Sequence, residues 1–164
     1  AYADAVRAVD MICSRPKTDT SRVYAHDESQ GGALTLVAAS LDRRIKGIAP
    51  SAPFLNDFED YFELASWPAD PIIAQAESLG ISREELMKTL SYFDVKNFTD
   101  RIECPVLMAI GLQDPVCPPH TNFAGYNMIE SEKRWICYPH SEHNVWQQKG
   151  WPEEKEKFFR TLYQ

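Results

Sequence analysis

Residues 21–41 have the sequence SRVYAHDESQGGALTLVAASL, and this stretch decides the fold. Its first part predicts a short β-strand over 21–27, built on Val23, Tyr24 and Ala25. Two glycines then open into a run of small and apolar residues, which predicts a buried helix over 33–41. Ser29 lies in the tight connection between the strand and the helix.

The same alternation of strands and helices continues on both sides of this stretch. Apolar runs predict further strands over 44–50, 104–110 and 134–138, and amphipathic periodicity predicts helices over 1–14, 119–129 and 151–163. Strands that alternate with helices form a mostly parallel sheet with crossover helices. We therefore expect an α/β fold in which flanking helices cover the sheet.

Residues 54–100 differ in composition from the rest of the chain. They are rich in aromatic residues, are interrupted by Pro68 and Pro71, and contain a capping box formed by Ser82 and Glu85. We expect a helical insertion over about 55–100 within a single domain spanning 1–164. The aromatic residues of 54–67 could line an acyl pocket, pack as core or form a subunit interface.

The first helix has an apolar stripe but no strand before it. The stripe consists of Tyr2, Val6, Val9 and Cys13, and the chain has no initiator methionine. An apolar stripe of this kind needs a sheet to cover it. We therefore expect the chain to begin in mid-fold, without the N-terminal strands of its domain.

Composition excludes several classes of partner. The 164 residues carry 17 basic and 24 acidic side chains, for a net charge of -7, with no basic cluster that would favour nucleic acid or an anionic membrane. No apolar run is long enough to span a bilayer, and we expect no signal peptide. These features predict a soluble protein.

The cysteines predict neither disulfides nor a metal centre. Cys13, Cys104, Cys117 and Cys137 form no C-x-x-C pair and have no zinc-site spacing with histidine. We expect reduced cysteines, with Cys104 and Cys137 in the core, and this favours a cytoplasmic protein.

We also expect no metal site at the three adjacent polar residues 26–28. Consecutive strand residues point to opposite faces, so His26, Asp27 and Glu28 cannot easily converge on one ion.

Ser29 is the candidate nucleophile. A nucleophile elbow places a serine on a strained strand-to-helix turn, and it needs small residues two positions before and two after the serine. Gly31 satisfies the second requirement, whereas Asp27 does not satisfy the first. A loop of this composition is also compatible with a simple helix N-cap.

An acid and two histidines follow Ser29 in the order that α/β-hydrolases use. Asp114 comes directly after the strongest strand, where it is either a triad acid or part of an Asp-Pro turn. His140 and His143 both follow the last strand. The order serine, acid, histidine favours a triad of Ser29, Asp114 and His143, with His143 as the general base. His120, near a helix start, is expected to be exposed.

Several segments together resemble the acetyl xylan esterase / cephalosporin C deacetylase family, carbohydrate esterase family seven. The resemblance spans nearly the whole chain and is carried by DAVRAV at 4–9, SQGGALTL at 29–36, PFL at 53–55 with Asp57 and Phe58, SYFDVKNF at 91–98, CPVLM at 104–108 and GLQDPVCPP at 111–119. The last segment is the most specific.

The resemblance implies a partial α/β-hydrolase fold and a serine carboxylesterase that needs no cofactor. It implies removal of acetyl groups from acetylated xylo-oligosaccharides and from cephalosporin C, and assembly into an intracellular hexamer. The catalytic residues carried over are Ser29, Asp114 and His143, and the backbone N–H of Gln30 is implied as an oxyanion donor.

The chain departs from the family pattern at three places. Asp27 and Glu28 replace two glycines before the nucleophile, and Glu142 and Asn144 flank His143 where the family has glycine and glutamate. We also expect the early loop with the second oxyanion donor to be absent, together with the N-terminal strands. These departures leave a catalytically impaired fragment, with a binding or assembly role, as the alternative to an active esterase. A serine peptidase or a dienelactone-hydrolase relative has the same triad order, but the segment 111–119 argues against both.

Overall fold

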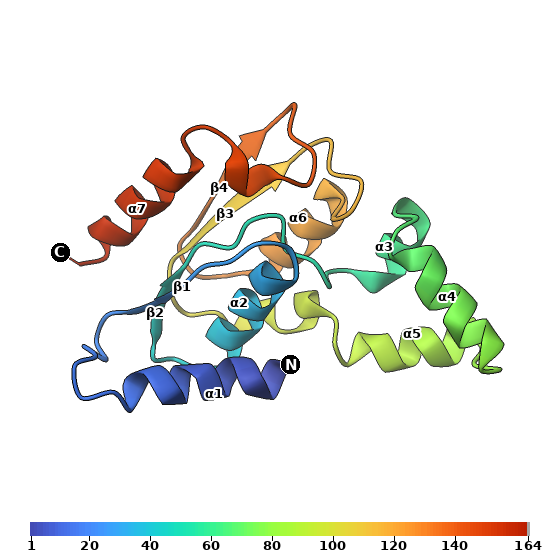
Figure 1. The fold of residues 1–164 in the computed structure, drawn as a ribbon, viewed down its shortest axis with the longest axis horizontal. Coiled ribbons are helices and arrows are strands. Elements are labelled where there is room, and N and C mark those ends of the chain that lie inside the picture. Colours follow the sequence, from blue (N-terminus) through green and yellow to red (C-terminus); the bar gives the residue numbers. More distant parts are fainter. Residues whose placement is uncertain (164) are drawn as a thin grey trace.

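The centre of the molecule is a four-stranded sheet, seen in a computed structural model that describes residues 1–163 (Figure 1). Its strands are β1 (Val23–Ala25), β2 (Ile45–Ile48), β3 (Val106–Gly111) and β4 (Lys133–Tyr138). They lie in the order β1-β2-β3-β4, and every neighbouring pair is parallel. The predicted α/β fold class with a mostly parallel sheet is therefore confirmed.

Helices connect the strands. The α-helices are α1 (Tyr2–Cys13), α2 (Ser29–Leu41), α3 (Phe58–Leu64), α4 (Ala69–Ser78), α5 (Arg83–Ser91), α6 (Pro119–Met128) and α7 (Trp151–Thr161). Short 3₁₀ helices occupy Val95–Asn97, Thr99–Arg101 and Val145–Gln147. Within residues 1–163, none of these helices has the length and apolar character needed to cross a membrane.

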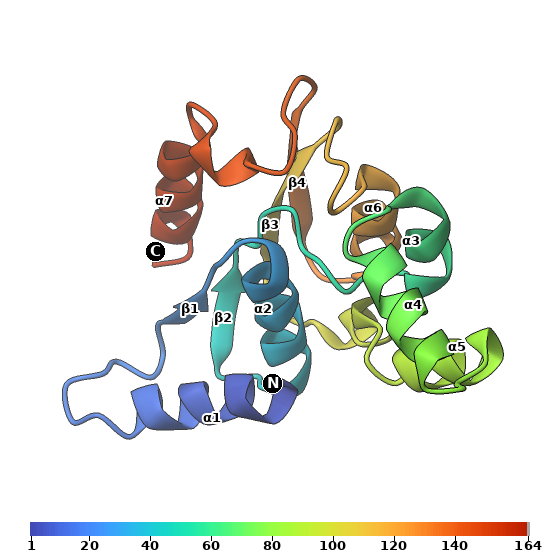
Figure 2. The same ribbon diagram turned by 45° about the vertical axis from the view of Figure 1, so that its right-hand side comes forward.

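Strand β3 is buried on both faces of the sheet. On β3, Val106, Met108 and Ile110 pack in one apolar cluster with α1, α2 and α6, whereas Leu107 and Ala109 pack in another with α7. Figures 1 and 2 show α1 and α2 stacked on one side of the sheet and α7 on the other. Strands buried on both faces are continuous apolar runs, and this explains why β3 was the strongest strand in the sequence.

Helices α3, α4 and α5 lie between β2 and β3 in the chain and extend away from the sheet on the side of α6 (Figure 2). Phe58, Tyr61 and Phe62 form a small apolar core of their own, so these aromatic residues pack internally. Trp67 differs, because 65% of it is exposed. The capping box of Ser82 and Glu85 starts α5, as predicted.

Two details differ from the sequence predictions. Helix α2 begins at Ser29 rather than at residue 33, because the two glycines form part of its first turn instead of a loop before it. All four cysteines are free, but Cys137 is only partly buried on the edge strand β4. An edge strand has one neighbour only, so its side chains are less completely covered.

Candidate active site

The turn from β1 to α2 holds Ser29 in a strained conformation. Its φ of +52° lies in the left-handed region, which costs a non-glycine residue about 1–3 kcal/mol. Two hydrogen bonds hold this conformation: the Ser29 N–H donates to the Ser51 carbonyl (3.0 Å), and the Phe54 N–H donates to the Ser29 carbonyl (3.0 Å). The loop after β2 therefore stabilises the turn that presents the Ser29 hydroxyl.

The two glycines after Ser29 make this turn possible. A Cβ on Gly32 would lie 3.1 Å from the Ser51 carbonyl oxygen and 3.3 Å from that of Asp27. A Cβ on Gly31 would lie 2.3 Å from Cγ of Asp27. Asp27 thus fits at the elbow, despite its size, because Gly31 has no side chain; it also accepts a hydrogen bond from the Glu28 N–H (2.9 Å).

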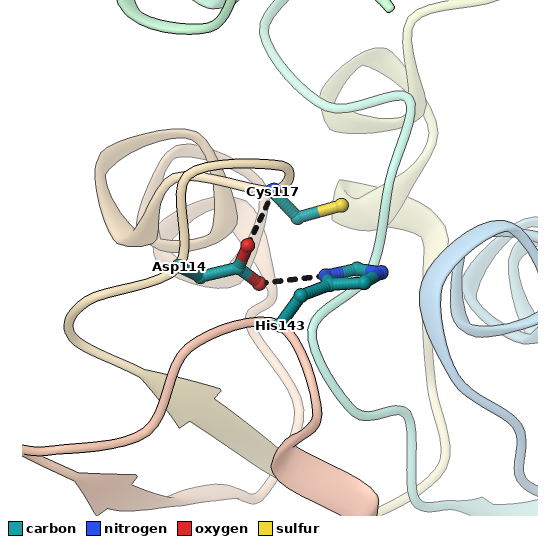
Figure 3. A group of neighbouring side chains, drawn as sticks. All are labelled: Asp114, Cys117 and His143. Carbon is teal, nitrogen blue, oxygen red and sulfur yellow. Dashed lines mark hydrogen bonds and ion pairs between the residues drawn. The ribbon is translucent and has the colours of Figure 1, made fainter. Parts of the chain in front are cut away.

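Asp114 lies in the loop after β3, and its carboxylate is buried and fully engaged. Oδ1 accepts the N–H groups of Val116 and Cys117, both at 2.8 Å, and Oδ2 faces Nδ1 of His143 at 2.8 Å. Only 1% of the Asp114 side chain is exposed. The carboxylate therefore has one defined orientation, directed at the imidazole (Figure 3).

His143 joins Asp114 to Ser29. Its Nε2 lies 3.0 Å from Ser29 Oγ, while its Nδ1 faces Asp114. An ionised carboxylate can only accept, so Nδ1 donates and Nε2 is free to accept the serine proton. His140 is exposed at the tip of the same loop. The structure thus brings together Ser29, Asp114 and His143, and not His140.

A close approach between two loops fixes the His143 position. A Cβ on Gly111, at the end of β3, would lie 2.6 Å from the Glu142 carbonyl oxygen. The Gln113 N–H donates to the Ser141 carbonyl (3.0 Å), and the Leu112 N–H donates to the Tyr138 carbonyl (3.2 Å). Both loops leave the carboxyl edge of the parallel sheet, where sites in this kind of fold form.

Gln30 occupies the second position of α2. Its N–H has no acceptor among residues 1–163, whereas the Ser29 N–H is bonded to Ser51 and the Gly32 N–H to Glu28. A free N–H at a helix N-terminus favours negative charge. Its position directly after Ser29 suits the predicted oxyanion donor.

A lysine of α7 faces the charged residues before Ser29. Burial, followed by the charge of Asp27, raises the pKa of Glu28, while Lys155 and His143 oppose this change. Lys155 Nζ lies 3.2 Å from Nδ1 of His26, and burial together with this ammonium lowers the His26 pKa. A lysine of α7 therefore offsets part of the negative charge beside the nucleophile.

Cys117 lies next to the triad, although its place in the sequence predicted no role for it. The thiol is buried, with 1% of the residue exposed, and it lies within 4.8 Å of ligand atoms of Asp114 and His143. Burial, followed by the charge of Asp114, raises the Cys117 pKa, and the Ser29 hydroxyl opposes this rise. The sequence signal that could have identified this neighbour is its position three residues after Asp114, because the loop folds back until the Cys117 N–H caps that carboxylate.

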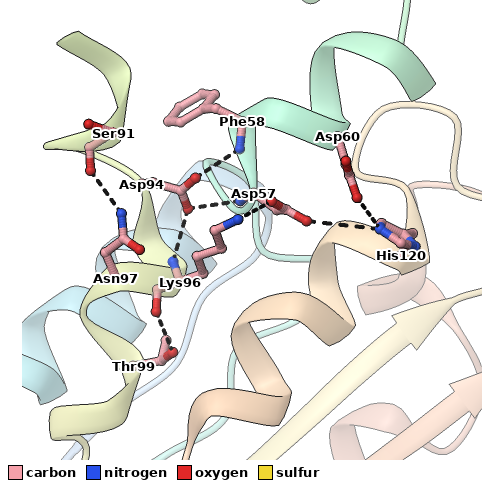
Figure 4. A network of polar contacts seen from close by, with 9 residues as sticks. All are labelled: Asp57, Phe58, Asp60, Ser91, Asp94, Lys96, Asn97, Thr99 and His120. Carbon is pink, nitrogen blue, oxygen red and sulfur yellow. Dashed lines mark hydrogen bonds and ion pairs between the residues drawn. The ribbon is translucent and has the colours of Figure 1, made fainter. Parts of the chain in front are cut away.

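A second polar network joins the helical segment to α6 (Figure 4). Asp94 accepts the N–H groups of Asp57 (2.8 Å) and Phe58 (2.9 Å) at the start of α3, and Lys96 pairs with Asp57. Exposed His120 lies 2.6 Å from Asp60. Although Asp57, Asp60 and His120 could together face a cation, the Lys96 ammonium already neutralises Asp57. We therefore assign this network a structural role.

The parallel sheet, the strained serine after β1, and the acid and histidine after β3 and β4 define the α/β-hydrolase class of folds. Comparison with known proteins specifies the family. The family model described as acetyl xylan esterase (AXE1) matches residues 1–161, so the chain belongs to the acetyl xylan esterase family.

Individual relatives agree with this assignment. Acetyl esterase Axe7A of Xylanibacter ruminicola is 36% identical over 142 residues, which are 87% of this chain and 32% of that protein. The crystal structure of acetyl xylan esterase 1 from Thermoanaerobacterium sp. JW/SL YS485 superposes with a TM-score of 0.90 at 34% identity, over 99% of this chain and 52% of that one. An acetyl xylan esterase from a Paenibacillus species gives 0.86 at 40% identity, over 99% and 51%. The chain therefore spans a third to a half of the length of these relatives.

Proposed function

We propose that this chain carries the catalytic residues of a serine carboxylesterase that removes acetyl groups through an acyl-enzyme. The observation that carries the proposal is the continuous relay from Ser29 Oγ to His143 Nε2 (3.0 Å) and from His143 Nδ1 to Asp114 Oδ2 (2.8 Å). This arrangement can deprotonate a serine and then return the proton to a leaving group.

Acylation follows from these contacts. As the Ser29 oxygen attacks the ester carbonyl, its proton passes to His143 Nε2, and Asp114 stabilises the imidazolium. The oxyanion forms beside the Gln30 N–H. The tetrahedral intermediate then collapses: the carbon–alkoxy bond breaks, and the imidazolium protonates the departing alcohol. Water repeats the sequence on the acetyl-serine and releases acetate.

Acetylated xylo-oligosaccharides and cephalosporin C are the proposed substrates. Support comes from the relatives, which carry the names acetyl esterase and acetyl xylan esterase. Aromatic residues also belong to the loop that holds the nucleophile: the Phe54 N–H donates to the Ser29 carbonyl (3.0 Å), and the Phe54 ring lies 5.3 Å from that of buried Tyr61. We propose that these two rings limit the space for the acyl group and so favour a short one. We further propose that the protein is cytoplasmic and assembles as a homo-oligomer.

A second candidate is a hydrolase-fold domain that binds or assembles without turnover. The specific observation in its favour is the pair Asp27 and Glu28, which places negative charge next to the atom where an oxyanion forms. Like charges disfavour that transition state.

A single experiment separates the two candidates. The chain is mixed with p-nitrophenyl acetate, and p-nitrophenolate release and the protein mass are followed together. We expect a burst of product and an acetyl adduct on Ser29, both absent in Ser29→Ala. If the folded chain gains no adduct and releases product no faster than Ser29→Ala, the esterase proposal is wrong and the binding role is favoured.

A further inference from the structure

Cys117 and His143 place a thiol and an imidazole side by side at the centre of the site. One ligand atom each from Asp114, Cys117 and His143 lie within 4.8 Å of one another. Figure 3 shows the Cys117 sulfur and the His143 ring extending in the same direction beside the Asp114 carboxylate. The proposed reaction uses the His143 imidazole and the Asp114 carboxylate but does not involve the Cys117 thiol.

The Asp114–His143 pair has the geometry of a metal ligand and its supporting carboxylate. A histidine that binds a metal through one ring nitrogen almost always donates the other N–H to a carboxylate or carbonyl. Here Nδ1 faces Asp114 Oδ2 at 2.8 Å, which leaves Nε2 with a lone pair. The contacts that prepare His143 to accept a proton also prepare it to bind a cation.

Ser29 and Cys117 complete a donor set around that lone pair. Ser29 Oγ lies 3.0 Å from Nε2, and the Cys117 sulfur lies within 4.8 Å of ligand atoms of both His143 and Asp114. Sulfur and imidazole ligands of a tetrahedral zinc ion are about 3.6 Å apart, so small side-chain rotations suffice. His143 is 24% exposed on its side chain, which provides a path for an ion.

We propose that the Cys117 thiolate and His143 Nε2 form a reversible binding site for a thiophilic divalent cation such as Zn²⁺ or Cd²⁺, supported by Asp114 and blocking Ser29. Binding replaces the thiol proton with the metal: the S–H bond breaks, an S–metal bond forms, and the proton leaves to solvent. Thiolate and imidazole select zinc-like ions over Mg²⁺ or Ca²⁺, which prefer oxygen ligands. The inference concerns binding, so it stands apart from the proposed turnover.

The test is a titration of the full chain with Cd²⁺, followed by the ultraviolet charge-transfer band of cadmium–thiolate bonds and by calorimetry. We expect one band with release of about one proton per ion. The band is lost in Cys117→Ala. It persists in Cys104→Ala, a buried thiol elsewhere, and in His120→Ala, which removes the histidine beside Asp60 and Asp57.

A band that survives in Cys117→Ala, or that disappears in Cys104→Ala or His120→Ala, would overturn the proposal, as would no binding by the unmodified chain. Circular dichroism checks each fold. If Cys117→Ala does not fold, Asp114→Asn decides, because it keeps both ligands and only weakens the support of the imidazole. We expect about 10- to 100-fold weaker Cd²⁺ binding in that variant, and unchanged affinity contradicts the site.

Discussion

The side chain of Asp27 occupies the space that a side chain on Gly31 would need, since a Cβ on Gly31 would come 2.3 Å from Cγ and Oδ2 of Asp27 and 2.8 Å from its Cβ. The elbow therefore accepts a large residue two positions before Ser29 because a glycine stands two positions after it. The two positions form one steric unit, and their mutational effects should be coupled.

Gly31→Ala is expected to destabilise the chain by about 1–3 kcal/mol, the usual cost of forcing extra volume into a packed site. In the Asp27→Gly background the same change is expected to be neutral or to stabilise by up to about 1 kcal/mol, because alanine favours the helix. Urea unfolding of the four proteins measures the coupling. Additive effects would contradict the steric unit.

Asp114→Asn is expected to lower the turnover of p-nitrophenyl acetate by about 10⁴-fold with little change in stability. An amide at this position keeps the Oδ1 contacts to Val116 and Cys117 but no longer selects the imidazole tautomer that accepts from Ser29. Initial rates and circular dichroism check both parts. His140→Ala is the matched control, and a large loss there would move the base to His140.

Asp27→Asn is expected to raise turnover about 2- to 5-fold and to lower the free energy of unfolding by about 0.3–1 kcal/mol. The carboxylate lies at the N-terminus of α2, where it stabilises the helix but competes with an oxyanion for the same positive field. Steady-state kinetics and urea unfolding measure the two changes.

Asp70→Asn provides the control for this trade-off. Asp70 is an exposed acid in the first turn of α4, away from Ser29, so its neutralisation should cost similar stability without changing turnover. Slower turnover in Asp27→Asn would show that the charge at position 27 assists the reaction.

Asp42 makes stability depend on pH. Hydrogen bonds from Arg44, which also pairs with Asp10 of α1, hold the Asp42 pKa below its ordinary value. A depressed pKa in the folded state contributes stability above the unfolded pKa of about 3.9, and this contribution is lost as pH falls through the folded pKa. Asp42→Asn should therefore lower the melting temperature at about pH 6 but have a smaller effect near pH 3. An equal effect at both pH values would contradict this ion pair as the cause.

The dependence of turnover on acyl chain length tests whether Phe54 and Tyr61 limit the space for the acyl group. We expect much faster turnover of the acetyl than of the octanoyl p-nitrophenyl ester, because the Phe54 backbone is hydrogen-bonded to that of Ser29 and the Phe54 ring packs against buried Tyr61. Phe54→Ala should narrow this difference by opening space. Comparable rates on both esters in the unmodified chain would argue for a lipase-like enzyme instead.

The sequence alone was sufficient for the alternation of strands and helices, for the α/β class and for the order of Ser29, Asp114 and His143. These features are local: a buried strand is a continuous apolar run, a helix repeats every 3.6 residues, and glycines mark the elbow beside the serine. The family resemblance rests on the same short segments.

Only the tertiary structure showed how His143, and not His140, comes to face Ser29, and placed the Cys117 thiol beside His143 and Asp114. Those outcomes depend on how the loops after β3 and β4 approach each other at Gly111, a contact between residues some thirty positions apart in the chain. The tertiary structure also showed how Asp27 fits at the elbow. The space available to its side chain is set by how closely the strand packs against the helix, and the spacing of residues in the sequence does not determine that packing distance.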